Sequence, residues 1–398
     1  MKVTFLHPDF GVGGAERLVL DAAIAFDQNG HQIEIVTNQF SETHCFSDAL
    51  KFKDSIIVTA QWVPRTLFNK FYALFAYLRL CIAALYVIFD ATADVVFIDQ
   101  ISLPLFLFKL AGFFYRPKLV FYCHFPDQKL TKREGSLKKA YRYFIDGLEN
   151  KTLALADKIY VNSLFTKNVC KETFPSVDPS RFDVLYPSVN TDFLDKSTDG
   201  HLDVEDKYEF VFVSLNRFEG KKNHLLALNV FERLKHRIPA EKFDKCLLVF
   251  AGGYDPLNGE NKVIYNELAE KTDKFGLNDN VKFLKSPSDD VKIELLKRAT
   301  LLFYTPENEH FGIVPLESMW LETPVLALRS GGPIETVEDT KTGILVDPEA
   351  DEDSFAHVFV KAVEDSKSFQ QMGKAGRTRV QDYFSFDAFT RKLLDTAL

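Results

Sequence analysis

Cysteine is scarce in this sequence of 398 residues, and its cysteines lie far apart. None belongs to a C-x-x-C pair, so the spacing favours neither a disulfide framework nor a zinc site. We therefore expect reduced thiols in a cytosol-facing protein, at Cys45, Cys81, Cys123, Cys170 and Cys246. Tryptophan (2) and methionine (3) are also rare, whereas phenylalanine is frequent, with 38 residues.

The sequence also lacks an excess of positive charge. It carries 48 Lys and Arg against 56 Asp and Glu, a net charge of −8, which argues against a general nucleic-acid-binding protein. The charges are unevenly spread, because residues 1–190 hold 21 basic against 19 acidic residues and the remainder holds 27 against 37. Within residues 102–143 there are nine basic and two acidic residues, so we expect a locally basic surface in the first half.

Low-complexity segments and short-period repeats are absent from the sequence. Apolar residues make up 46% and charged residues 26%, which is typical of a folded globular chain, and the length favours two domains. The first residues, M-K-V-T-F-L-H-P-D, hold one lysine and a short apolar run. They predict a first β-strand rather than a signal peptide.

Short apolar runs alternate with helical patterns along the chain, which predicts an α/β protein with parallel sheets and helices on both faces. Strands are predicted at 3–6, 33–36, 94–99, 119–123, 158–161 and 182–186, and again at 209–214, 246–250, 281–284, 300–304, 325–327 and 343–346. Helices are predicted between them, including a long apolar helix at 67–89, one near 103–113 and one over 370–396.

The two series of strands predict two Rossmann-like domains. A polar, turn-rich segment near 187–204 separates the series and is the expected linker. We expect a first domain at 1–190, a second domain at 205–375 and a C-terminal helix at 376–398 that returns toward the first domain. Ligands bind at the carboxyl ends of the strands in such sheets, so the expected site is a central cleft that both domains face.

A glycine-rich loop, G-V-G-G-A-E at 11–16, follows the first predicted strand and precedes a helix. Its glycines, with Gly13 and Gly14 as the candidates, let backbone N–H groups approach a phosphate at the helix N-terminus. The dinucleotide-binding fingerprint is a competing interpretation, but Glu16 stands where its third glycine belongs, and the second strand ends in V-T-N, where an acid belongs. A tight turn that binds no ligand stays an alternative.

Two turns of the second series carry cations or glycines directly after a strand. Arg217 and Lys222 lie five residues apart in N-R-F-E-G-K-K-N, where an Arg fork and a Lys point charge could clamp a diphosphate. A solvated basic turn is the alternative. Gly252, in A-G-G-Y-D, would permit close backbone approach, and S-G-G-P-I-E at 330–335 is another glycine turn.

The segment P-E-N-E-H-F-G-I-V-P-L-E at 306–317 places Glu309 and Glu317 eight residues apart, with a predicted helix start between them. The free N–H groups of a helix start suit an anion, and a glutamate on each side could hold sugar hydroxyls. The alternatives are a surface glutamate for Glu317 and a helix-start carboxylate for Glu309.

With these motifs, nearly the whole chain resembles the retaining glycosyltransferases of family 4, which have the GT-B fold. Three longer segments are similar to the members that assemble dolichol-linked oligosaccharides in eukaryotes: H-P-D-F-G-V-G-G-A-E-R-L-V at 7–19, C-H-F-P-D at 123–127 and N-E-H-F-G-I-V-P-L-E at 308–317. The resemblance implies GDP-mannose as the donor and Man-GlcNAc2-diphosphodolichol as the acceptor. It implies extension first α-1,3 and then α-1,6, at the cytosolic face of the endoplasmic reticulum membrane.

The resemblance also implies a role for each candidate residue. Arg217 and Lys222 would hold the GDP diphosphate, Glu309 the mannose and Glu317 the ribose. His124 would lie near the transferred sugar, with a structural histidine as the alternative. The remaining donor-binding candidates are Gly13, Gly14, Gly252, Phe311, Gly312 and Ile313.

Neither a resident cofactor nor a metal-ligand cluster is expected, although Mg²⁺ could assist from solution. No carboxylate of the first domain is predicted as a nucleophile, so we expect front-face attack by the acceptor hydroxyl. Two alternatives stay open: a GT-B transferase with another acceptor, and an inactive GT-B subunit that acts as a scaffold.

The apolar segment 67–89 is long enough to span a bilayer, but it contains Lys70 and Arg79, which are costly there. Its many aromatic residues favour an interfacial helix, and a buried domain helix or a true span are the alternatives. The aromatic and basic segment 103–125 could add to the same surface and attract anionic lipids. We therefore expect the first domain to meet a membrane.

Overall fold

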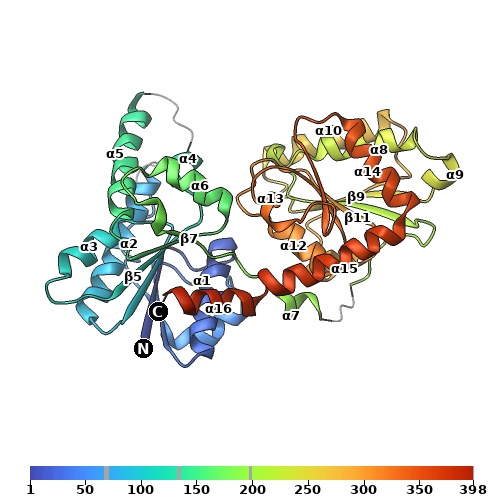
Figure 1. Ribbon diagram of the computed structural model, residues 1–398. Helices are drawn as coiled ribbons and strands as arrows, with labels where there is room; N and C mark the ends of the chain where they lie inside the picture. Colours follow the sequence, from blue (N-terminus) through green and yellow to red (C-terminus); the bar gives the residue numbers. More distant parts are fainter. Residues whose placement is uncertain (67–70, 132–135, 197–199, 398) are drawn as a thin grey trace. The chain divides into compact units, whose positions relative to one another are not determined.

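The computed structural model describes residues 1–66, 71–131, 136–196 and 200–397. Part of the segment predicted as a long apolar helix, 67–70, lies outside the described residues. The chain folds into two compact units (Figure 1). Unit 1 is Met1–Ser188 with Phe386–Leu398, and unit 2 is Val189–Ser385.

Unit 1 is built on a seven-stranded sheet whose strand pairs are all parallel, in the order β3-β2-β1-β4-β5-β6-β7. The order reverses between β1 and β4, and such a point is where α/β sheets bind ligands at their carboxyl edge. The strands are β1 (Lys2–His7), β2 (Gln32–Thr37), β3 (Ile56–Val58), β4 (Val95–Asp99), β5 (Lys118–Cys123), β6 (Lys158–Val161) and β7 (Phe182–Val184).

Helices cover both faces of this sheet, which is why its strands are apolar on both sides. Val3 and Phe5 pack toward α1 (Gly14–Gln28) and α16 (Phe386–Ala397), whereas Leu6 packs toward the opposite layer. That layer contains α2 (Tyr72–Asp90), α3 (Pro104–Ala111), α5 (Ser136–Leu153) and α6 (Leu164–Thr173). The unit also contains η1 (Ser47–Ser55), α4 (Asp127–Leu130) and η2 (Pro179–Arg181).

Unit 2 contains a six-stranded parallel sheet in the order β10-β9-β8-β11-β12-β13, which reverses between β8 and β11. Its strands are β8 (Phe210–Leu215), β9 (Cys246–Gly252), β10 (Val281–Lys285), β11 (Leu301–Tyr304), β12 (Val325–Leu328) and β13 (Gly343–Val346). Its helices are α7 (Thr191–Leu194), η3 (Gly220–Lys222), α8 (His224–Lys235), α9 (Ala240–Phe243), α10 (Gly259–Lys274), α11 (Asp289–Arg298), α12 (Ile313–Trp320), α13 (Pro333–Thr336), α14 (Glu352–Glu364) and α15 (Ser366–Tyr383).

The chain returns to unit 1 through α16, but the single helix predicted over 370–396 is wrong. The structure has two helices there, because α15 ends at Tyr383 and α16 begins at Phe386. Ser385 at the break forms a parallel bridge with Val189, and α16 then packs against α1. The sequence has neither glycine nor proline at 384–385 to mark this break.

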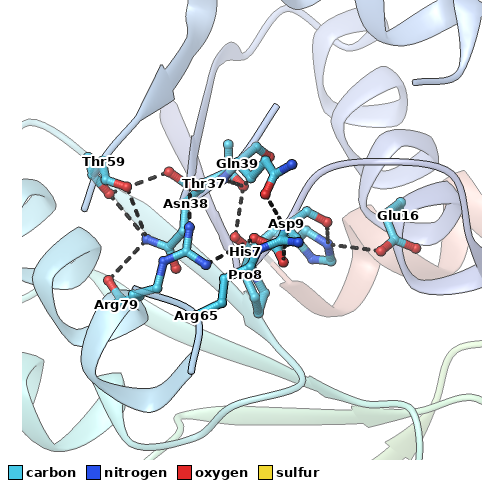
Figure 2. A network of polar contacts seen from close by, with 10 residues as sticks. All are labelled: His7, Pro8, Asp9, Glu16, Thr37, Asn38, Gln39, Thr59, Arg65 and Arg79. Carbon is cyan, nitrogen blue, oxygen red and sulfur yellow. Dashed lines mark hydrogen bonds and ion pairs between the residues drawn. The ribbon is translucent and has the colours of Figure 1, made fainter. Parts of the chain in front are cut away.

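Among the described residues, one helix, α2, is long and apolar enough to cross a membrane. Arg79 lies in its middle and is buried against the sheet of unit 1. Its guanidinium donates a hydrogen bond of 2.7 Å to the carbonyl oxygen of Asn38, whose side-chain amide donates one of 3.0 Å to the carbonyl oxygen of Arg79 (Figure 2). This face of α2 is therefore part of the domain, whereas residues such as Leu78 and Phe89 on the same helix are exposed.

Leu393→Ala tests whether α16 is part of the core of unit 1. Leu393 is fully buried together with Phe389, so we expect its truncation to lower the free energy of unfolding by about 2–5 kcal/mol. Chemical denaturation of the full chain measures this loss. Arg391→Ala, on the exposed side of the same helix, is the matched control and should change stability by less than about 0.5 kcal/mol. Equal stabilities of the two variants would contradict the packing described here.

Candidate active site

The carboxyl ends of adjacent strands bring the predicted residues of unit 2 together. Arg217 and Lys222 follow β8, and Glu309 follows β11, which is the neighbour of β8 where the strand order reverses. Lys222 and Glu309 are 87 residues apart in sequence, and yet the Lys222 Nζ lies 2.5 Å from the Glu309 Oε2. The sheet topology therefore creates this pair.

The Lys222–Glu309 pair is largely shielded from solvent. The Lys222 side chain is 11% exposed, and its backbone carbonyl accepts a hydrogen bond of 2.6 Å from the Thr305 hydroxyl. Burial alone would raise the pKa of the Glu309 carboxyl, but the hydrogen bond and charge of Lys222 lower it below its usual range. Glu309 is therefore ionised and fixed beside a cation, at the place where the sequence predicts both a sugar and a phosphate.

Arg217 differs from Lys222 in its surroundings. Its side chain is 63% exposed and forms an ion pair of 2.9 Å with Glu219 in the same loop. The guanidinium can therefore turn toward a bound anion with little loss of stabilisation, since exposed ion pairs contribute about 1 kcal/mol or less.

Helix α12 begins between the two predicted glutamates. Gly312 precedes it with a φ of 86°, a conformation that favours glycine, and Phe311 is buried beside Phe384. Glu317 lies on the helix, where its side chain is 18% exposed and its Oε1 lies 3.2 Å from the Nζ of Lys292 of α11. Burial raises the pKa of the Glu317 carboxyl in spite of this ammonium. No sequence motif identified Lys292.

The glycine turns of unit 2 let neighbouring loops touch. A Cβ at Gly252, whose φ is 143°, would collide with the carbonyl oxygen of Asn216, so this glycine allows the loop after β9 to pack against the loop that carries Arg217. In the same way, Cβ atoms at Gly331 and Gly332 would collide with the backbone of residues 309–311. The Gly332 N–H also donates a hydrogen bond of 2.7 Å to the Glu309 carbonyl. These glycines position the candidate donor-binding loops.

In unit 1, the glycine loop and His124 lie at the carboxyl edge of the sheet. Gly13 precedes α1 in an extended conformation, and a Cβ there would meet the Glu16 carboxylate, whereas Gly14 has open space beside it. Figure 2 shows Glu16 directed at His7, with 3.6 Å between its Oε1 and the His7 Nε2. His124 follows β5 with a side chain that is 25% exposed, and it is hydrogen-bonded.

The polar loops at this edge of unit 1 also hold each other in place. The Arg65 guanidinium lies 2.8 Å from the Asp9 carboxylate and also contacts the Gln39 side chain, and Asp9 lies between it and the Arg79 guanidinium (Figure 2). Within the described residues, the structure has no group of three or more His, Cys, Asp or Glu side chains that could hold a metal ion.

Comparisons with known proteins agree with this geometry. Residues 202–379 match the family described as "Glycosyl transferases group 1", and residues 12–193 match "Glycosyltransferase Family 4". The chain is 44% identical to the human alpha-1,3/1,6-mannosyltransferase ALG2, with 98% of this chain and 94% of the human protein covered. It is 39% identical to the Dictyostelium discoideum protein of the same name, with 99% and 97% covered.

Solved structures show the same fold at low sequence identity. A glycosyltransferase from Rickettsia africae superposes with a TM-score of 0.74 at 19% identity, over 100% of this chain and 98% of that chain. The fold and the two family matches thus define a glycosyltransferase, and the predicted α/β, GT-B fold is confirmed. More narrowly, the chain belongs to the α-1,3/1,6-mannosyltransferase family, as its relatives at 35–44% identity show.

Gly332→Ala tests whether the glycine turn after β12 positions the Glu309 loop. A methyl group there must displace the backbone of Phe311, so we expect GDP affinity to fall at least about tenfold, which is about 1.4 kcal/mol. Isothermal titration with GDP measures this effect. Gly259→Ala is the matched control, because nothing lies within 4 Å of a Cβ at Gly259. If both variants bind GDP as tightly as the unchanged chain, the turn does not position the site.

Proposed function

We propose that this chain transfers mannose from GDP-mannose to Man-GlcNAc2-diphosphodolichol, first in α-1,3 and then in α-1,6 linkage, with retention at the anomeric carbon. The names of its relatives as α-1,3/1,6-mannosyltransferases support the linkages. The single structural observation that supports the chemistry is the largely shielded Lys222–Glu309 pair at the reversal point of the unit 2 sheet.

In this proposal the donor separates the pair. The GDP diphosphate attracts the Lys222 ammonium and the Arg217 guanidinium, so the Glu309 carboxylate is free to accept hydrogen bonds from mannose hydroxyls. Glu317, kept in place by Lys292, accepts hydrogen bonds from the ribose hydroxyls. The N–H groups of Phe311, Gly312 and Ile313 at the start of α12 bind sugar and phosphate oxygens. Contacts from Gly13, Gly14, Gly252 and His124 stay predictions.

The transfer then proceeds at one face of the mannose. The bond between the anomeric carbon and the diphosphate oxygen breaks as the acceptor hydroxyl attacks from the same side, and the hydroxyl proton passes to the leaving phosphate oxygen. Negative charge grows on that oxygen in the transition state, so cations beside it stabilise the transition state more than the bound donor. Lys222 and Arg217 supply these cations without a metal ion being required.

Lys222→Ala and Glu309→Ala test this assignment. We expect each to lower kcat at least about 100-fold, because each removes a charged contact to the reacting donor. The assay follows transfer from GDP-[¹⁴C]mannose to a Man-GlcNAc2-diphospholipid, with circular dichroism to verify folding. Lys221→Ala, on the exposed neighbouring residue, is the matched control. Near-normal turnover of either test variant would refute the assignment.

We also propose that unit 1 binds the membrane of the endoplasmic reticulum at its cytosolic face, through the outer side of α2 and α3. These helices pack together, and six phenylalanines of the described chain are exposed, all within 71–144. The α2–α3 apolar surface consists of Tyr72, Leu74, Leu78, Leu85, Tyr86, Phe89, Phe106, Leu110, Phe113 and Phe114.

Positive charge borders the α2–α3 apolar surface. Phe113 and Leu110 help to line a cavity of about 730 Å³ together with Lys109, Arg116 and Lys118. Asp157 also lines it and pairs with Lys109, so the lining carries a net positive charge. Exposed aromatic side chains beside cations are typical of proteins that lie on an anionic lipid surface. This arrangement supports an interfacial α2 whose Arg79 side is held by the domain.

Phe89→Ser combined with Phe113→Ser tests the membrane contact. Both side chains are at least 80% exposed, so the substitutions should leave the fold intact and reduce flotation with vesicles that contain anionic lipid. Leu257→Ser is the matched control, because Leu257 is 92% exposed but belongs to unit 2. Flotation that is equal for the double variant and the control would show that this surface does not bind the membrane.

A further inference from the structure

Three strands of unit 1 end in side chains that meet at one buried carboxylate. β1, β4 and β5 are neighbours where the strand order reverses, and they lead to His7, Asp99 and His124. The His7 Nδ1 lies 2.7 Å from the Asp99 Oδ1, and the His124 Nε2 lies 3.1 Å from the Asp99 Oδ2. Each oxygen of the Asp99 carboxylate therefore has its own imidazole partner.

His7 is the fixed cation of this group. It is fully buried, and its Nε2 donates a hydrogen bond of 3.0 Å to the carbonyl oxygen of Asp9, with the Glu16 carboxylate at 3.6 Å. Burial alone would lower the pKa of His7, but the charges and hydrogen bonds of Asp99 and Glu16 raise it to about 10. Both ring nitrogens of His7 thus carry hydrogens near neutral pH, and both are used.

Asp99 is the fixed anion. Its side chain is fully buried, and burial alone would raise the pKa of its carboxyl, but the charge of His7 and the hydrogen bonds from His7 and His124 lower it. An ionised carboxylate only accepts hydrogen bonds, so the His124 Nε2 must carry a hydrogen. In neutral His124, the Nδ1 is then the acceptor.

The orientation of the His124 ring is fixed as well as its tautomer. The Tyr122 ring lies against it, with 4.7 Å between the ring centroids. Asp99 itself cannot turn away, because its other oxygen is bound to His7 inside the sheet. The partly exposed His124 therefore presents one defined nitrogen, supported by two residues that solvent does not reach.

We propose that Asp99 is a positioning residue for His124 in mannosyl transfer, and that His7 keeps Asp99 in place. The inference rests on the proposed function, since it takes His124 as the group that contacts the transferred sugar. Asp99 holds the imidazole in the Nε2–H form, so that Nδ1 can accept a hydrogen bond from a sugar hydroxyl. Such an orienting partner matters because the other tautomer would place an N–H of His124 against the O–H that the sugar donates.

The tautomer can be measured without any enzyme assay. The full chain is labelled with ¹⁵N-histidine, and the His124 signals are identified by their loss in His124→Gln. We expect neutral His124 to be the Nε2–H tautomer. Asp99→Asn should mix the two tautomers, because a side-chain amide can donate a hydrogen bond as well as accept one. An Nδ1–H tautomer in the unchanged chain would overturn the proposal, even if Asp99→Asn does not fold.

Kinetics separate positioning from a structural role. Asp99→Asn should lower kcat by about 10- to 100-fold, with a KM for GDP-mannose within about twofold of the unchanged chain. Combined with His124→Gln, it should lower kcat no further than His124→Gln alone. Additive losses would overturn the proposal. Full activity of His124→Gln would instead refute the contact of His124 with the sugar, whereas loss of transfer in the unchanged chain would refute the proposed function.

Discussion

The ion pair between Lys222 and Glu309 joins two loops that leave adjacent strands at the point where the strand order of unit 2 reverses. Each partner needs the other, because an unpaired charge at this depth would be costly. The glycine turns at 252 and 331–332 let neighbouring loops pack against the two loops that carry Lys222 and Glu309. Under the proposed function, a donor that carries both a diphosphate and a sugar offers each partner a replacement, so the pair can separate when the donor binds.

Unit 1 places polar groups at the same edge of its own sheet, in a different pattern. Its charges are used internally: Arg79 is bonded to Asn38, Arg65 to Asp9, and His7 to Asp99. The outer side of α2 and α3, in contrast, is apolar and exposed. Under the proposed function, the ordered polar edge would meet the sugar of a lipid-linked acceptor and the apolar surface would meet the lipid.

The sequence predicted nearly every strand and most helices, because buried parallel strands are continuous apolar runs and the loops after them carry glycine. It did not predict β3, which has three half-buried residues, or the break at 384–385. Glu309 and Lys222 were identified singly, but their contact depends on strand order. Lys292 was missed because it matters through its ion pair with Glu317, which lies on another helix. Asp99 was missed because the pairing of β4 with β5 brings it beside His124, and no local motif encodes that pairing.

The account is tested most directly by the products that the unchanged full chain forms. It is incubated with GDP-[¹⁴C]mannose and a Man-GlcNAc2-diphospholipid in vesicles, and the labelled glycan is released for linkage analysis. The account predicts two added mannoses, the first α-1,3-linked and the second α-1,6-linked. Absence of label in the lipid fraction, with folded protein that binds GDP, would contradict it. Mannose added in any other linkage would contradict it as well.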